Sequence, residues 1–186
     1  MKTIRPKAEQ AIIEAGFIQL NENPKASLAN IAQQAGVGRA TLHRHFTSRD
    51  DLIHAMARQA MQEMDDAADQ ASQHCNSYSS ALEQIFKAMI PLGVRHWFIS
   101  NESLSDLPDI AAKLKQQEQE LKGLIKRCKK EGLFSADWSN DWIIQVFDHM
   151  IHAAWTLLKE DQATLQQAST WAWGTLINGL QSGASS

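Results

Sequence analysis

Apolar residues recur three and four positions apart along most of this chain, and that spacing constrains its fold more than any other feature. A repeat near 3.6 residues places such side chains on one face of an α-helix, whereas a β-strand requires alternation, and no convincing alternating run is found. Only 9 glycines and 4 prolines interrupt the 186 residues, 44% of which are apolar. The pattern predicts an all-α protein with about nine helices and a substantial core.

Two short helices joined by a very short turn are predicted near the N-terminus. Ser27 can cap a helix that runs to about Ala35, and Gly36 can end it, because glycine readily adopts the left-handed backbone of a helix C-terminus. A second short helix is expected over residues 39–45. The connection is too short for any arrangement other than a helix-turn-helix corner.

Longer helices are predicted on both sides of this corner. The first ends before Pro24, and the second begins at Ser48, whose hydroxyl can cap its free amide groups. We therefore expect a helix-turn-helix domain over residues 1–48 and a C-terminal domain over residues 49–186, connected by a helix over residues 49–71. Further helices are expected over residues 80–97, 107–130, 140–159 and 164–180, followed by an unstructured tail over 181–186.

Charge is divided unevenly along the chain. Residues 1–58 contain eight Lys and Arg residues and five Asp and Glu residues, so this segment carries +3 while the whole chain carries −3. Residues 59–186 therefore carry a net charge of −6. A basic segment on a larger acidic one is expected where one end of a protein meets phosphate groups and the other meets something else.

Side chains that can bind DNA gather on or beside the exposed face of the second short helix. A recognition helix presents its N-terminal half to the major groove, where Arg39 and Thr41 could contact base edges. Arg49, at the start of the next helix, could contact a phosphate group. The candidate DNA-binding residues are Ser27, Arg39, Thr41, His43, Arg44, His45 and Arg49.

The N-terminal segment resembles the TetR/AcrR family of bacterial transcription regulators. The resemblance is carried by residues 27–37 (SLANIAQQAGV) and 41–46 (TLHRHF) with Arg49 and Leu52, and it spans about residues 5–56. It implies that the residues at Ser27, Arg39, Thr41, His43, His45 and Arg49 contact phosphates or bases. Family members usually carry Ser at Gly38 and Tyr at His43, so a capping hydroxyl and a phosphate-binding phenol are absent here.

The resemblance also implies what such a protein does. It would be a repressor that binds a palindromic operator in double-stranded DNA as a homodimer and is released by a small hydrophobic inducer. The alternative is a DNA-bound scaffold protein of the same fold without a small-molecule switch. The residues leave the inducer, the operator sequence and the regulated genes open.

The last two predicted helices carry more apolar surface than one neighbouring helix can cover, including Trp142, Trp155, Trp171 and Trp173. By resemblance, these helices pair with their mates in a four-helix bundle between two chains. An inducer pocket would lie among the helices at 80–97, 107–130 and 140–159, where Met and aromatic side chains can line an adaptable cavity. Its candidate residues are Phe86, Met89, Trp97, Leu121, Phe147 and His149, for which ordinary core packing is the other interpretation.

No enzyme motif is found: the P-loop, GxSxG and GxGxxG patterns are all missing. His149 and His152 are three positions apart on one helix face, but no Cys or carboxylate lies at a zinc spacing beside them and the HExxH pattern is missing. The chain has only two cysteines, no secretory leader and no apolar run near the roughly 20 residues that span a bilayer. We therefore expect a cytoplasmic protein without catalytic activity, metal or cofactor.

Overall fold

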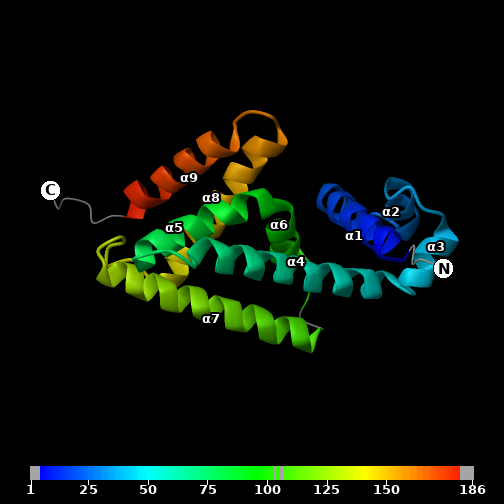
Figure 1. Cartoon of the computed structure of the whole chain (residues 1–186), viewed down its shortest axis with the longest axis horizontal. Coiled ribbons are helices and arrows are strands. Elements are labelled where there is room, and N and C mark those ends of the chain that lie inside the picture. Colours follow the sequence, from blue (N-terminus) through cyan, green and yellow to red (C-terminus); the bar gives the residue numbers. More distant parts are fainter. Residues whose placement is uncertain (1–4, 103, 105–106, 181–186) are drawn as a thin grey trace.

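The computed structural model describes residues 5–102, 104 and 107–180, and this part of the chain is built from helices without strands (Figure 1). The all-α prediction is therefore confirmed. The elements are α1 (Arg5–Glu22), α2 (Leu28–Gln34), α3 (Arg39–His45), α4 (Arg49–Ser72), α5 (Tyr78–Met89), the 3₁₀ helix η1 (Ile90–Leu92), α6 (Gly93–Asn101), α7 (Pro108–Lys130), α8 (Asn140–Lys159) and α9 (Leu165–Leu180).

The first three helices form a compact unit, which we call the head. Phe17 of α1, Ile31 of α2 and Leu42 of α3 are almost completely buried in its core, and burying a side chain of this size contributes roughly 1.5–3 kcal/mol. The corner between α2 and α3 forms as predicted. The Ser27 hydroxyl accepts a hydrogen bond from the Asn30 amide at 3.2 Å, and Gly36 has a φ of 67°, which a residue with a side chain rarely adopts.

Helix α4 begins where the sequence predicts and connects the head to the rest of the chain (Figure 1). The Ser48 hydroxyl caps it by accepting a hydrogen bond from the Asp51 amide at 3.0 Å. Its first turns contribute Leu52 and Met56 to the core of the head, while Met64 packs against the second core, which α5, α7, α8 and α9 share. We call α5 to α9 the body. Head and body therefore share packed surfaces along α4.

The predicted single helix over residues 80–97 is wrong. The structure has two helices there, α5 and α6, separated by the one-turn 3₁₀ helix around Pro91. Proline has no amide hydrogen and its ring collides with the carbonyl of the preceding turn, so an α-helix cannot continue undisturbed through it. The apolar period continues across Pro91, which hides the break. As a result α6 is a separate helix of 9 residues.

The remaining predicted helices agree with α7, α8 and α9 to within about two residues at each end, which is the usual uncertainty of helix boundaries. Gly132 follows α7 with a φ of 82°, as expected of a helix-ending glycine. The predicted tail over 181–186 lies outside the described residues. Among the helices that the structure describes, none combines the length and the apolar character required to cross a bilayer.

Candidate DNA interface and ligand cavity

Helix α3 lies at the end of the molecule farthest from α9 (Figure 1). Arg39, His43 and Arg44 are exposed, and Thr41 is half-buried. The Arg44 guanidinium donates a hydrogen bond to the Thr41 hydroxyl at 3.1 Å, so these two side chains form one polar surface. No side chain caps α3, because its N-cap residue is Gly38. The free amide groups at this end stay available for an anionic oxygen.

Two of the predicted DNA-binding residues, His45 and Arg49, contact other segments of the protein. The His45 side chain is only 12% exposed and its Nδ1 lies 3.6 Å from a carboxylate oxygen of Glu9 on α1. His45 therefore lies beside the exposed face of α3, because α3 packs against α1 on that side. The Arg49 guanidinium donates to the backbone carbonyls of Pro24, at 2.6 Å, and Ala26, and so closes the turn before α2.

Ser27 is exposed, although its hydroxyl already accepts the capping hydrogen bond at the start of α2. The same hydroxyl donates to Asn30 Oδ1, so a phosphate oxygen would have to replace that contact. Arg49 uses two of its nitrogen atoms within the chain and retains further donors, since a guanidinium carries five N–H groups. The geometry thus keeps both residues beside the candidate DNA surface while giving each a structural role.

The body exposes aromatic side chains on α8 and α9. Trp142 is 50% exposed and Trp171 is 54% exposed, which is unusual for the largest apolar side chain. Gly174, one turn after Trp171, has no atom within 4 Å of the position that a Cβ would take. By contrast, Ile143 and Ile151 of α8 are buried inside the chain. The large apolar side chains that stay exposed in this region are Trp138 and Trp142 at the start of α8 and Leu165 and Trp171 on α9.

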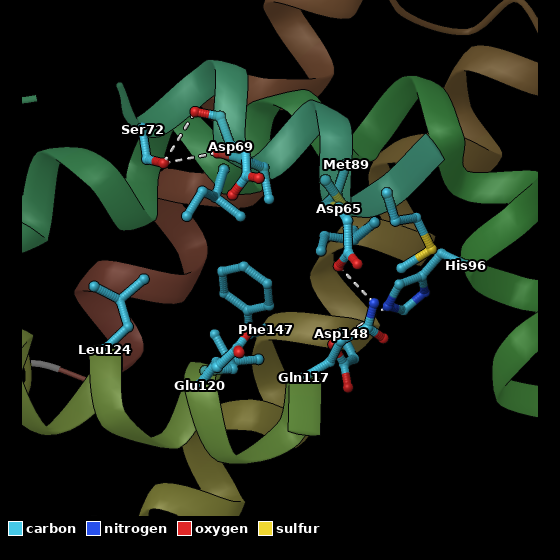
Figure 2. Close-up of a pocket in the computed structure, with 15 residues that line it drawn as sticks. Asp65, Asp69, Ser72, Met89, His96, Gln117, Glu120, Leu124, Phe147 and Asp148 are labelled. Atoms are coloured by element: carbon cyan, nitrogen blue, oxygen red, sulfur yellow. Dashed lines mark hydrogen bonds and ion pairs between the residues drawn. The ribbon is translucent and has the colours of Figure 1, made fainter. Parts of the chain in front are cut away.

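A cavity of about 250 Å³ lies among α4, α5, α6, α7 and α8 (Figure 2). Its apolar wall includes Phe147 and the residues of the second core around it. Figure 2 shows Asp69 and Ser72 on one side of the Phe147 ring and His96 with Asp148 on the other. The lining residues are Met64, Asp65, Ala68, Asp69, Ser72, Ile85, Met89, His96, Gln117, Glu120, Leu121, Leu124, Phe147, Asp148 and Ile151.

The cavity lining is strongly acidic. It includes the carboxylates of Asp65, Asp69, Glu120 and Asp148, and no Lys or Arg is found among the described residues that line it. Asp65 is partly neutralised, because the Lys113 ammonium lies 2.8 Å from one of its oxygens and the Gln117 amide donates to the other at 2.6 Å. Asp148 faces His96, with Nε2 3.3 Å from Oδ1. The lining thus carries excess negative charge next to an aromatic surface.

The structure brings three of the six predicted ligand residues to this cavity: Met89, Leu121 and Phe147. Phe86 is fully buried behind the lining and packs edge-on against Phe147, with ring centroids 5.2 Å apart. Trp97 stacks on His152 outside the lining, with centroids 4.1 Å apart. His149 is exposed, and its Nδ1 lies 2.7 Å from the Gln145 carbonyl oxygen one turn earlier.

The sequence analysis missed the acidic lining residues. Asp65, Asp69 and Ser72 lie three and four positions apart on α4, so they share one helix face with Met64 and Ala68. That mixed face was the available signal, because it places carboxylates beside apolar residues on one side of α4.

His152, next to Trp97, makes the stability of the folded protein depend on pH. Its Nδ1 is buried and has no hydrogen-bond partner in the described part of the chain. Burial lowers the pKa of His152, and the nearby His96 and His149 lower it further. The unfolded chain therefore binds a proton near pH 6.5 that the folded protein does not bind, so stability falls as the pH drops through and below 6.5.

We expect the His152→Phe variant, which keeps a ring against Trp97 but cannot titrate, to lose less stability than the wild type between pH 7.5 and pH 5.5. Urea unfolding at several pH values measures this difference. The His74→Gln variant, at an exposed residue between α4 and α5, is the control and should follow the wild-type profile. Identical profiles for wild type and His152→Phe would contradict the assignment.

Comparisons with known proteins agree with this geometry. The family model of bacterial regulatory proteins, tetR family, matches residues 10–56, which include the head core and the start of α4. The HTH-type transcriptional repressor LfrR of Mycolicibacterium smegmatis is 27% identical over 157 residues, which make up 84% of this chain and 82% of that protein.

Solved structures extend the similarity over nearly the whole chain. The TetR-like regulator LfrR from Mycobacterium smegmatis, crystallised in complex with proflavine, aligns with a TM-score of 0.76 at 25% identity and covers 97% of this chain and 100% of its own. The ketosteroid transcriptional regulator KstR2 of Mycobacterium tuberculosis aligns with a TM-score of 0.77 at 16% identity, covering 97% and 98%. The second similarity supports the fold alone.

The family-model match falls on the same helix-turn-helix that the structure displays, and the repressor relative covers both head and body. These relatives are transcription regulators and not enzymes. The chain is thus similar in its helix-turn-helix to the tetR family of bacterial regulatory proteins, and over most of its length to the TetR-like repressor LfrR.

Proposed function

We propose that this protein is a homodimeric repressor that binds a palindromic DNA operator and is released from it when a planar aromatic cation occupies the acidic cavity. DNA binding would place it in the cytoplasm. The observation that carries the proposal is the cavity itself. If side chains filled the centre of the body, the structure would favour a DNA-bound scaffold protein. An open space lined by carboxylates next to Phe147 favours a regulator that binds a small molecule.

The DNA-binding part of the proposal rests on α3. Arg39 and Thr41 stand in the first turn of this helix, where a recognition helix contacts base edges in the major groove. Arg44 and His43 extend the same surface toward the DNA backbone. One such helix reads only a few base pairs, so a specific site requires two helices spaced by one turn of DNA, about 34–36 Å.

The dimer would form through α8 and α9. A two-fold interface places the same surface of both chains in contact, and aromatic side chains are enriched in the cores of such interfaces. Trp171 is the most exposed of the large apolar side chains described, and Gly174 beside it permits close approach of a partner helix. Burial of Trp171 in a second chain would explain why the sequence places it there.

The class of inducer follows from the chemistry of the cavity. Carboxylates near an apolar surface favour a cationic group, and an aromatic ring packs against a flat π-system. The relative LfrR was crystallised in complex with proflavine, a flat aromatic cation with three fused rings. A cavity of about 250 Å³ that opens at its rim can hold a molecule of this size. The sequence led us to expect a small hydrophobic inducer, and the acidic cavity narrows this class to hydrophobic molecules that carry a positive charge.

Selection of bound fragments from a pool of short genomic duplexes, at moderate salt, tests the DNA-binding part. We expect enrichment of a palindrome whose half-sites lie about one helical turn apart. If no sequence is enriched and binding disappears uniformly as salt rises, the protein contacts only phosphate groups and is not a sequence-specific repressor.

A further inference from the structure

The two ends of the acidic cavity differ in how exposed their side chains are. Asp69 of α4 and Glu120 of α7 are exposed and lie at the opening, and we call these two residues the outer end. Asp148 of α8 lies with His96 of α6 on the other side of the Phe147 ring from Asp69 (Figure 2). We call Asp148 and His96 the inner end, because their side chains are only 34% and 13% exposed. A ligand that lies along the ring meets both ends.

The outer end carries a fixed negative charge. In the described part of the chain, neither Asp69 nor Glu120 forms an ion pair with a Lys, Arg or His side chain. Glu120 accepts a hydrogen bond from the Gln116 amide at 2.8 Å, which leaves its charge in place. Solvated carboxylates are ionised throughout the range of pH in which histidine titrates. The outer end therefore attracts a cation at every pH in that range.

Asp65 adds no net charge to the cavity, because it is paired with a permanent cation. The Lys113 ammonium lies 2.8 Å from one of its oxygens, and the hydrogen bond to Asp65 raises the pKa of Lys113. The lysine therefore stays protonated when the pH changes near neutrality. Gln117 donates to the other Asp65 oxygen at 2.6 Å. Asp148, by contrast, has a partner that titrates.

His96 can change the charge of the inner end without breaking its contact with Asp148. Its Nε2 lies 3.3 Å from Asp148 Oδ1. An imidazole nitrogen that carries a hydrogen donates to a carboxylate in both the neutral and the protonated form of the ring. The pair therefore carries one negative charge when His96 is neutral and no net charge when His96 is protonated. Histidine is the side chain whose charge ordinarily changes between about pH 5 and about pH 8.

The other groups that face His96 do not follow the same titration. His152 of α8 stays neutral to a lower pH than an ordinary histidine, because burial lowers its pKa and the nearby His96 lowers it further. Asp65 of α4 keeps its lysine partner, and the 3₁₀ helix η1 has no titratable side chain. The neighbour of His96 on α6, Arg95, is paired with Glu14 of α1 and Glu63 of α4.

We infer that the inner end makes the cavity distinguish ligands by their number of positive charges, and that uptake of a proton by His96 removes this preference. The inference rests on the proposed function and specifies its ligand class. When His96 is neutral, Asp148 favours a second positive charge, so an aromatic molecule with a cationic group at each end binds best. When His96 is protonated, it serves as the cation for Asp148 and repels a second charge on the ligand. His96 is thus a specificity-determining residue.

Two small probes of similar length measure this preference. Methyl viologen and N-methyl-4-phenylpyridinium each contain two linked aromatic rings, and their charges are permanent, so neither probe titrates. Methyl viologen carries a positive charge at each end, whereas the phenylpyridinium carries one charge only. Calorimetric titration without DNA gives both affinities. We expect the ratio of the viologen affinity to the phenylpyridinium affinity to be about tenfold larger at about pH 8 than at about pH 5.5, because one contact between charged groups is gained.

Three variants assign the effect to the inner end. His96→Gln keeps an amide donor near Asp148 but cannot be charged, so its affinity ratio should stay at the value for about pH 8 at both pH values. Asp148→Asn should lose about tenfold of the viologen affinity at about pH 8 and less than about threefold of the phenylpyridinium affinity. His54→Gln is the matched control, because His54 Nε2 lies 3.2 Å from Asp109 in a histidine–aspartate pair that does not line the cavity. It should keep the wild-type pH dependence.

The outcomes distinguish the two proposals. If the affinity ratio of wild type does not change with pH, or if His96→Gln changes as wild type does, the inner end does not select by charge and this inference is wrong. The proposed function then still stands if proflavine binds and releases the operator. If wild type binds neither the probes nor proflavine, the cavity takes no cation and both proposals are wrong. A cooperative melting transition at both pH values confirms that the variants are folded.

Discussion

Trp171→Glu is expected to convert the dimer into a monomer and to weaken operator binding more than about a hundredfold. Trp171 is 54% exposed near the middle of α9, where a two-fold interface would place it in the contact. Two carboxylates would then be buried opposite each other without partners, which is strongly unfavourable. Each released head would contact only half of a palindrome. Analytical ultracentrifugation measures the mass, and fluorescence anisotropy with a labelled duplex measures the affinity.

Tyr78→Glu is the matched control for this prediction. Tyr78 is 46% exposed at the start of α5, so the substitution adds the same charge at a similarly exposed aromatic residue outside α8 and α9. It should leave the mass and the operator affinity unchanged. A Trp171→Glu protein that sediments as a dimer would show that the chains associate elsewhere.

The double variant Asp69→Asn and Asp148→Asn is expected to weaken proflavine binding by about a hundredfold or more, because a hydrogen bond to a charged group contributes roughly 1.5–3 kcal/mol. Asparagine has nearly the same shape as aspartate, so the cavity keeps its form while it loses two of its four carboxylates. The increase in proflavine polarisation on binding measures the affinity. The single variants should each show part of the loss.

Asp66→Asn provides the control on the same helix. Asp66 is exposed, accepts a hydrogen bond from Gln62 at 2.8 Å, and does not line the cavity. Its replacement changes the net charge of the protein without changing the cavity, and proflavine affinity should stay at the wild-type value. Equal losses for Asp66→Asn and for the cavity variants would mean that proflavine responds to the overall charge and does not occupy this site.

The sequence predicted the helices well because their ends depend on local interactions. Ser27 and Ser48 cap helices with their own hydroxyl groups, and Gly36 and Gly132 end helices with their own backbone geometry. Such contacts span at most a few residues, so a pattern in the sequence contains them. Pro91 was the exception, because the apolar spacing around it continues and outweighed the breaking effect of one residue.

The cavity could be predicted only in part because it depends on how helices meet. Periodicity identifies the face of a helix that is buried, and it thereby placed Met89 and Phe147 inside the body. It does not show where neighbouring helices leave space between them. Asp69 and Asp148 were not identified because the opposite wall of the cavity comes from distant segments. The contact of His45 with Glu9 could not be predicted for the same reason, since the approach of α1 determines which side of α3 is covered.

The most direct test of the account is the release of the selected palindromic duplex by proflavine, compared between wild type and the Asp69→Asn and Asp148→Asn double variant. The comparison is required because a planar cation also binds duplex DNA by itself, and this effect is equal for both proteins. We predict that wild type dissociates at proflavine concentrations that leave the variant bound. Dissociation of both proteins at the same concentration, or of neither, would contradict a repressor controlled through the acidic cavity.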